Sequence, residues 1–318
     1  MRILYGIQCT GNGHVNRSMK IISKLKKLGH VVDIVLSGKN SNIILPFEVK
    51  YRFKGFTFFN TKNGGIDYLK TFASFDFFNF IKDITLHVED YDKVISDFEP
   101  VTAWACKLHG IECYGISNQY SFISKKTPRD GKSYVGEFIL KNMAPVDNPI
   151  GLHYDNYDDF IYKPIINNSI IRTKTQDYGY YSVYLPSFNL NNILTELTKS
   201  ISKKFHIFHN DINSIYRYKN CLIYPIDKKI FISSFVNSHG IIANAGFQTS
   251  AEALYMSKKL MVIPVKGQYE QESNAFALQK LGIFSGKLNN ITDFLETDKV
   301  LFDKWDDPTD SIINLIIG

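Results

Sequence analysis

Short apolar runs alternate with amphipathic segments along most of the chain. Ile3–Gln8 and Val31–Leu36 are apolar runs on either side of a helical pattern over Asn16–Leu28, which Gly29 ends. The same order returns at Val94–Ser96, Val101–His109 and Cys113–Ile116. A strand, a crossover helix and a second strand at this spacing predict a parallel sheet with helices on both faces.

The pattern blurs in the middle of the chain and then restarts. Four prolines stand among polar residues between Thr127 and Asn168, which favours a domain boundary near residues 160–178. Strands are predicted again at Tyr180–Leu185, Phe205–His209, Leu222–Tyr224, Ile241–Ala243 and Leu260–Val265, and helices at Leu190–Ser200, Lys229–Val236, Glu270–Leu281 and Asp310–Ile317. We therefore predict an α/β chain of two doubly wound (Rossmann-like) domains, residues 1–165 and 166–318. The last helix is a candidate to cross back to the first domain.

Composition narrows the class of protein. The chain has 318 residues, 44% hydrophobic and 21% charged, which suits two globular domains. No run reaches the roughly 18 apolar residues of a transmembrane helix, and the first residues do not resemble a signal peptide. The four cysteines form no CxxC pair, so we expect reduced thiols in the cytoplasm. The net charge of +6 favours anionic partners such as nucleotides, acidic lipids or nucleic acid.

The segment from Gly240 to Ala275 has the chemistry of a phosphate site. The small residues Asn244-Ala245-Gly246 follow an apolar strand, and Thr249 stands at the start of the next helix. Small residues let the backbone approach a ligand, and the N–H groups of a first helical turn point at any anion placed there. Further polar side chains stand at or near the starts of this helix and the next: Glu252, Glu270, Gln271 and Asn274. This arrangement suits a sugar nucleotide.

A second candidate site follows the first strand, at Cys9-Thr10-Gly11-Asn12-Gly13-His14. In an open α/β sheet, ligands bind beyond the carboxyl ends of the strands. The spacing G-x-G-H-x-x-R places Arg17-Ser18 where a dinucleotide-binding motif has its last glycine, and no acidic residue follows Val31–Leu36. A nicotinamide enzyme is therefore disfavoured. The chain also lacks the P-loop motif of many ATPases.

Together the two segments resemble the glycosyltransferases of the GT-B fold, in which two doubly wound domains face a central cleft. UDP-sugar-dependent members carry a signature H-C-G-W-N-S-x-x-E, then a proline strand and D-Q-x-x-N. Here the run from Asn244 to Glu252, Pro264 and the run from Glu270 to Asn274 stand in register with it. The turn that ends in His14 is similar to the T-G-G-H of the lipid II N-acetylglucosaminyltransferase. The stretch from about Thr57 to Gln176 carries no such resemblance.

The resemblance implies a role for each matching residue. The N-terminal domain would bind the acceptor, and the C-terminal domain would bind a nucleotide sugar, with a UDP-sugar as the expected donor and no other cofactor. Gly246 and Thr249 would hold the diphosphate, Glu252 the ribose, and Glu270 with Gln271 the transferred sugar. The remaining residues assigned to the donor are Gly11, Gly13, Ser187, Asn244, Ala245 and Asn274.

His14 would act as the general base that takes the acceptor's proton, and Asp97 would hold its ring in one tautomer. Single displacement by such a base inverts the anomeric carbon. Two alternatives stay open: His14 caps the helix or contacts the donor phosphates, and Asp97 is the N-cap of the helix after Pro100. No metal is expected, because Asp90-Tyr91-Asp92 precedes its strand and does not follow it.

The acceptor is the least determined part. A cluster of phenylalanines fits a core, an apolar acceptor wall or a membrane-facing lip: Phe72, Phe75, Phe77, Phe78 and Phe80. We favour a hydroxyl acceptor that is a lipid or small molecule, with peripheral contact at the inner face of the cytoplasmic membrane. The alternatives are transfer to a hydroxylated DNA base, and a sugar-nucleotide sensor or epimerase of the same fold. An epimerase would need further carboxylates, for which Glu99 and Glu137 are the candidates.

Overall fold

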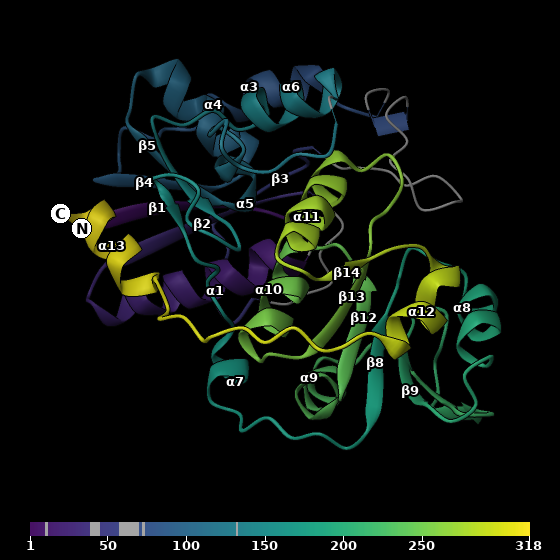
Figure 1. Cartoon of the computed structure of the whole chain (residues 1–318). Helices are drawn as coiled ribbons and strands as arrows, with labels where there is room; N and C mark the ends of the chain where they lie inside the picture. Colours follow the sequence, from purple (N-terminus) through teal and green to yellow (C-terminus); the bar gives the residue numbers. More distant parts are fainter. Residues whose placement is uncertain (10–11, 39–44, 57–69, 72–73, 132) are drawn as a thin grey trace.

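The computed structural model describes residues 1–9, 12–38, 45–56, 70–71, 74–131 and 133–318. These residues form two α/β units, each built on a twisted sheet (Figure 1). Each sheet has seven strands in the part of the chain described. The two-domain α/β architecture predicted from the sequence is therefore confirmed.

The first sheet is parallel throughout, with the strand order β3-β2-β1-β4-β5-β6-β7. Its strands are β1 (Arg2–Gln8), β2 (Val31–Ser37), β3 (Tyr51–Phe53), β4 (Lys93–Asp97), β5 (Cys113–Ser117), β6 (Asn148–Leu152) and β7 (Ile161–Tyr162). The helices of this half are α1 (Asn12–Lys27), α3 (Phe77–Asp83), α4 (Pro100–His109), α5 (Asn118–Ser121), α6 (Tyr134–Asn142) and α7 (Asn168–Ile171). Because β1, β4 and β5 are neighbours, the segments that follow them meet at one edge.

The second sheet has the order β10-β11-β9-β8-β12-β13-β14, and only β10 with β11 is antiparallel among its described pairs. Its strands are β8 (Tyr180–Tyr184), β9 (Lys204–Phe208), β10 (Tyr216–Tyr218), β11 (Cys221–Tyr224), β12 (Gly240–Asn244), β13 (Lys259–Ile263) and β14 (Phe284–Ser285). The helical segments are α8 (Leu190–Leu197), α9 (Lys228–Asn237), α10 (Phe247–Tyr255), α11 (Tyr269–Lys280), η1 (Leu288–Asn290), α12 (Ile291–Glu296) and α13 (Thr309–Ile317). Helices α10 and α11 begin at the carboxyl edge of this sheet.

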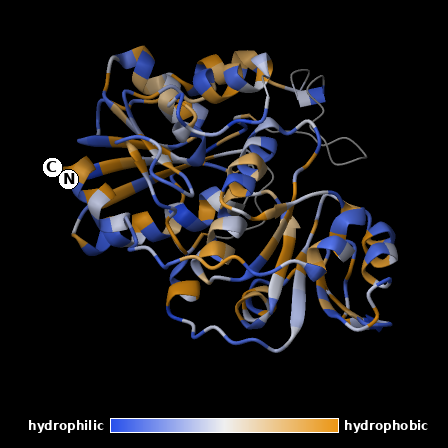
Figure 2. Ribbon diagram, viewed as in Figure 1, coloured by the Kyte–Doolittle hydropathy of each residue, from blue (hydrophilic) through white to orange (hydrophobic). Residues whose placement is uncertain are grey.

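Hydrophobic residues lie along the strands of both sheets (Figure 2), and many of their side chains are buried. One buried cluster is continuous across both halves of the molecule, from Ile3 in β1 through Phe247 in α10 to Ile312 in α13. All four cysteines are buried. None of the described helices is both long enough and apolar enough to cross a bilayer.

The chain passes between the two halves twice, and the two passages touch. Helix α13 packs against α1 of the first half, where Lys24 pairs with Asp310 at 3.0 Å (Figure 1). The indole nitrogen of Trp305, in the second passage, donates to the carbonyl of Pro164 in the first at 2.9 Å. Lys20 of α1 contacts both passages, through the carbonyl of Ile166 and the carboxylate of Asp307.

The strands and helices expected from the periodic segments are present, with small shifts at their ends. The largest shift is in α1, which begins at Asn12 and so includes Gly13 and His14 in its first turn. The expected start at Asn16 is wrong. The unmatched middle of the chain holds short elements that the pattern did not reveal: α3, α5, α6, β6, β7 and α7. Their lengths, two to nine residues, are too short for a clear hydrophobic period.

Candidate active site

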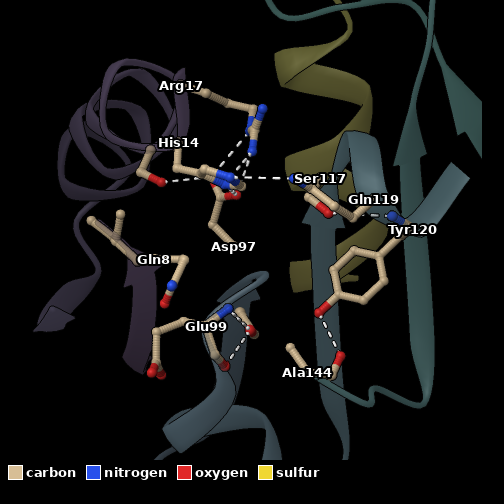
Figure 3. Close-up of polar contacts among 12 residues, drawn as sticks. Gln8, His14, Arg17, Asp97, Glu99, Ser117, Gln119, Tyr120 and Ala144 are labelled. Carbon is tan, nitrogen blue, oxygen red and sulfur yellow. Dashed lines mark hydrogen bonds and ion pairs between the residues drawn. The ribbon is translucent and has the colours of Figure 1, made fainter. Parts of the chain in front are cut away.

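A buried ion pair lies where β1 and β4 end. The His14 Nδ1 atom is 2.7 Å from Oδ1 of Asp97, and Ser18 Oγ donates to Oδ2 of Asp97 at 2.8 Å. Arg17 donates to both carboxylate oxygens, with its Nε 3.0 Å from Oδ2. Figure 3 shows His14 and Arg17 converging on Asp97. Asp97 is fully buried, and its four contacts come from one turn of α1.

These contacts define the charge and the tautomer. Burial alone would raise the pKa of Asp97, but the charge of Arg17 and the contact with His14 outweigh it and hold that pKa below its ordinary value. Asp97 is therefore ionised and can only accept hydrogen bonds. The hydrogen of a neutral His14 ring is thus assigned to Nδ1, which leaves the lone pair on Nε2, 3.5 Å from Nε2 of Gln119.

Asp97 is not the N-cap of α4, so that alternative is wrong. Glu99 is the cap: its carboxylate accepts from the N–H groups of Val101 and Thr102 at 2.8 and 2.7 Å. Glu99 is fully buried in that role. The other epimerase candidate, Glu137, accepts from Arg129 and from Tyr269, both at 2.7 Å. Both carboxylates are therefore occupied by structural contacts.

The helix terminus at Gly246 is open. Gly246 is the N-cap residue of α10, and no side chain caps the helix. A Cβ atom built on Gly246 would meet no atom of the described residues within 4 Å, so these residues leave room for a group at that position. By contrast, a Cβ on Gly13 would lie 3.4 Å from Cβ of Gln248. The starts of α1 and α10 therefore approach closely, and free N–H groups with the positive end of the helix dipole adjoin that contact.

Glu252 lies one turn further along α10. Its Oε1 accepts a hydrogen bond from Nε2 of Gln248 at 2.8 Å. Burial raises the pKa of Glu252 to about 7, and Gln248, the backbone of Asn167 and the charges of Lys228 and Lys20 counter only part of that effect. The residue is half-buried. It is a hydrogen-bonding group with little solvation.

Glu270, in the first turn of α11, reaches the first half of the molecule. Its Oε2 accepts a hydrogen bond of 2.9 Å from Nε2 of Gln119, which follows β5. The same amide nitrogen is 3.5 Å from Nε2 of His14 (Figure 3). Burial raises the pKa of Glu270, and the charge of His14 and the hydrogen bond from Gln119 oppose that rise. Glu270 and His14 therefore face the same small volume from opposite domains.

The other donor candidates surround the open terminus. Ser187 donates to Oδ1 of Asn244 at 2.9 Å, and Asn244 donates to the carbonyl of Ile263 at 2.9 Å. The buried Asn274 donates to the carbonyl of Ala245 at 3.3 Å. Gln271 accepts from the N–H of Val265 at 3.2 Å, so its carboxamide oxygen supports the loop before α11. Thr249 is half-buried in the first turn of α10, and Gly11 lies outside the described residues.

The comparisons with known proteins agree with this geometry. The family model described as "Glycosyl transferase family 1" matches residues 1–299. The chain belongs to glycosyl transferase family 1. It is therefore a glycosyltransferase. No curated protein matches the chain by sequence.

Solved structures show the same GT-B fold. MurG from Acinetobacter baumannii has a TM-score of 0.62 and 12% sequence identity, over 99% of each chain. UGT89C1 from Arabidopsis thaliana, complexed with UDP, has a TM-score of 0.60 and 12% identity, over 92% of this chain and 90% of that one. SnogD from Streptomyces nogalater has a TM-score of 0.53 and 13% identity, over 99% of each chain. At sequence identities of 12–13%, these similarities establish the fold alone.

Three residues of this candidate site belong to none of the glycosyltransferase-like motifs in the sequence. Arg17 and Ser18 stand out in the sequence only as a departure from a dinucleotide-binding motif, and Gln119 lies in no motif. A signal existed for Gln119, because Ser117-Asn118-Gln119 is a polar run directly after a buried strand. Arg17 could have been found as the residue one helical turn after His14.

Two further expectations concern metal ions and the phenylalanines. The described residues contain no group of three or more His, Cys, Asp or Glu side chains that could hold a metal ion. Asp92 accepts from the backbone N–H of Arg2 at 2.6 Å, at the start of β1 and away from the site. Phe75 stacks on Phe56 with centroids 4.1 Å apart, whereas Phe77 and Phe78 are 59% and 87% exposed. Phe72 lies outside the described residues.

Proposed function

We propose that the chain is a metal-independent, inverting hexosyltransferase that uses a nucleotide-diphosphate sugar, with a UDP-sugar as the preferred donor. The observation that carries this proposal is the pair of His14 and Asp97 facing Glu270 beside the open terminus of α10. A base, a sugar-binding carboxylate and an anion site then adjoin one another. UGT89C1, of the same fold, is complexed with UDP.

Each group has a defined task in the proposed reaction. The diphosphate binds the N–H groups at Gly246, where the helix dipole stabilises the charge that develops on the leaving group. Glu252 accepts from the ribose hydroxyls, and Glu270 with Gln271 from hydroxyls of the sugar. His14 takes the acceptor's proton on Nε2 while the acceptor oxygen attacks the anomeric carbon. Asp97 stabilises the resulting imidazolium. One displacement on one face inverts that carbon.

The proposed acceptor is a lipid or another apolar hydroxyl compound, reached at the inner face of the cytoplasmic membrane. An exposed apolar surface supports this assignment. It consists of Phe77, Phe78 and Ile81 on α3 and Tyr134, Val135 and Phe138 on α6, which both lie along the upper edge in Figure 1. Large exposed aromatic side chains are costly in water and suit contact with a lipid surface. MurG has the same fold, and its structure aligns with this one over 99% of each chain.

The test begins with thermal unfolding in the presence of UDP-glucose, UDP-galactose, UDP-N-acetylglucosamine and dTDP-glucose. A donor that binds only the native state raises the midpoint. His14→Ala is expected to keep that shift and to lose nucleotide release in the presence of diacylglycerol vesicles. His87→Ala, whose side chain is 79% exposed, is the matched control and should retain both properties. An active His14→Ala enzyme would refute the assignment of the base.

The acceptor class is tested separately. Vesicles of phosphatidylglycerol with diacylglycerol are compared with duplex DNA that contains hydroxymethylated bases, at two salt concentrations. Transfer to the vesicles supports the lipid assignment. Transfer to DNA, with binding that falls steeply as salt increases, would replace it. If the natural protein binds the donor but transfers sugar to neither vesicles nor DNA, it is a sugar-nucleotide sensor.

A further inference from the structure

Gln119 stands at the meeting point of the two domains. It belongs to α5, directly after β5, and only 6% of the residue is exposed. The backbone beneath it is held firmly, because Ser117 caps α5 and Asn118 donates to the carbonyl of Leu152 at 3.0 Å. Its side chain nevertheless leaves its own domain and reaches Glu270 of the other. This position is fixed by the fold.

The amide nitrogen of Gln119 occupies a chemically specific point. It lies 2.9 Å from Oε2 of Glu270 and 3.5 Å from Nε2 of His14. Both neighbours are hydrogen-bond acceptors, one a carboxylate and the other the nitrogen that must receive a proton. A nucleophilic hydroxyl would need the same point, since its hydrogen must face Nε2 of His14.

The other end of the Gln119 amide is incomplete. Its Oε1 atom is buried and has no hydrogen-bond partner among the described residues. Buried carboxamide oxygens are nearly always paired, because an unpaired one costs free energy. The amide nitrogen of Gln119 thus contacts the acceptor atoms of His14 and Glu270, while its amide oxygen has no donor among the described residues.

We propose that Gln119 is a place-holder for the acceptor hydroxyl, which keeps water away from His14 until an acceptor displaces the amide. The inference rests on the proposed function. When an acceptor enters, its hydroxyl takes the contact with His14, and the Gln119 amide turns so that its oxygen accepts from a substrate hydroxyl. Gln119 is therefore a specificity residue, which favours transfer over hydrolysis.

Removal of the place-holder allows a defined side reaction. A water oxygen forms a bond to the anomeric carbon of the sugar, and the bond from that carbon to the diphosphate oxygen breaks. The electron pair of the broken bond leaves with the nucleoside diphosphate. One water proton moves to Nε2 of His14, and the products are free sugar and nucleotide. A carboxamide side chain is larger than a water molecule, so Gln119→Ala leaves room for water at this point.

The experiment measures UDP release from UDP-glucose at saturating donor with no acceptor present; if thermal unfolding favours another UDP-sugar, that donor is used. Gln119→Ala is expected to hydrolyse the donor at least about tenfold faster than the natural enzyme, a small part of the roughly 10²–10⁴ that a general base supplies. Gln119→Leu fills the space with an apolar group and should show no increase. The double variant His14→Ala/Gln119→Ala should lose the gain. Gln279→Ala, on the exposed side of α11, is the matched control.

The outcomes separate the two proposals. If no UDP-sugar binds the natural enzyme, the proposed function fails. If the donor binds and Gln119→Ala releases no more UDP than the natural enzyme, the place-holder is refuted and the transferase proposal stands. If Gln119→Leu raises UDP release as much as Gln119→Ala does, the place-holder is also refuted. A leucine side chain fills the space, so the rise could not come from water entering it. Thermal unfolding of each variant establishes that it is folded.

Discussion

Replacing Asp97 by Asn separates the structural role of this carboxylate from its proposed catalytic role. Asp97 is fully buried, and the side chain of its partner Arg17 is 3% exposed. The substitution keeps the shape but leaves the guanidinium without a counter-charge. Breaking a buried pair in this way costs about 3–5 kcal/mol. Since domains are typically stable by about 5–15 kcal/mol, the variant should fold with a clearly reduced urea midpoint.

The same substitution changes the tautomer of His14. An Asn side chain can present its NH₂ group to Nδ1, which moves the ring hydrogen to Nε2 and removes the lone pair that accepts the proton. A misplaced tautomer of this kind lowers kcat by about 10⁴-fold in a comparable His–Asp pair. We expect a loss of about 10³- to 10⁴-fold in nucleotide release in the presence of acceptor vesicles.

A second variant distinguishes the two effects. Asp97→Asn/Arg17→Met removes both charges, so most of the lost stability should return while the activity stays low. Asp33→Asn is the matched control, because Asp33 pairs with Lys50 at 2.6 Å but lies outside the site. If the double variant regained activity together with stability, Asp97 would serve only to neutralise Arg17, and the reasoning about the tautomer would be wrong.

Three other substitutions test separate features of the site and the fold. Because the folded pKa of Glu252, about 7, lies above its ordinary value of 4.5, the natural protein loses stability as pH rises through this range. Glu252→Gln should therefore be more stable above pH 7, by about 3 kcal/mol at most, and should bind donor more weakly; equal urea midpoints at pH 5 and 8 in both proteins would contradict this. Gly246→Ala should cost about 1 kcal/mol or less, since its Cβ meets open space, yet lower donor affinity in calorimetry about tenfold by entering the phosphate site. Unchanged affinity would place the phosphate elsewhere. Ile312→Ala, at a fully buried position of α13, should cost about 2–5 kcal/mol in urea unfolding, and a smaller loss would mean that α13 is loosely packed.

The long periodic segments made the architecture predictable. Runs such as Ile34–Leu36 and Leu260–Ile263 are continuously apolar because parallel strands are covered on both faces. The residues of the two glycine-containing turns could also be found, since small residues after a strand have few other uses. Nothing in the spacing showed which side chains meet across the cleft. His14, Gln119 and Glu270 are separated by 105 and 151 residues, and only the folded chain places them together.

The start of α1 illustrates a different limit. Gly13 has low helix propensity, which favoured a turn over a helix at that position. The start of α1 lies against the partner domain, where a Cβ atom on Gly13 would be in van der Waals contact with Cβ of Gln248, 3.4 Å away. Similarly, Asp97 and Glu99 are both acidic residues before Pro100, and local sequence could not distinguish the cap from the partner of His14. Tertiary contacts decided both cases.

The paired passages at Pro164 and Trp305 bear on how a substrate enters. Two segments joined to each other at one end of the interface leave little freedom for the halves to slide or twist independently. We expect any opening to be a swing about that joint, with an amplitude that grows with distance from it. Lys20, which bonds to both passages, would stay in place during the swing, while the contact of Gln119 with Glu270 would break. The same opening of the two halves would then admit the nucleotide sugar and release the nucleotide.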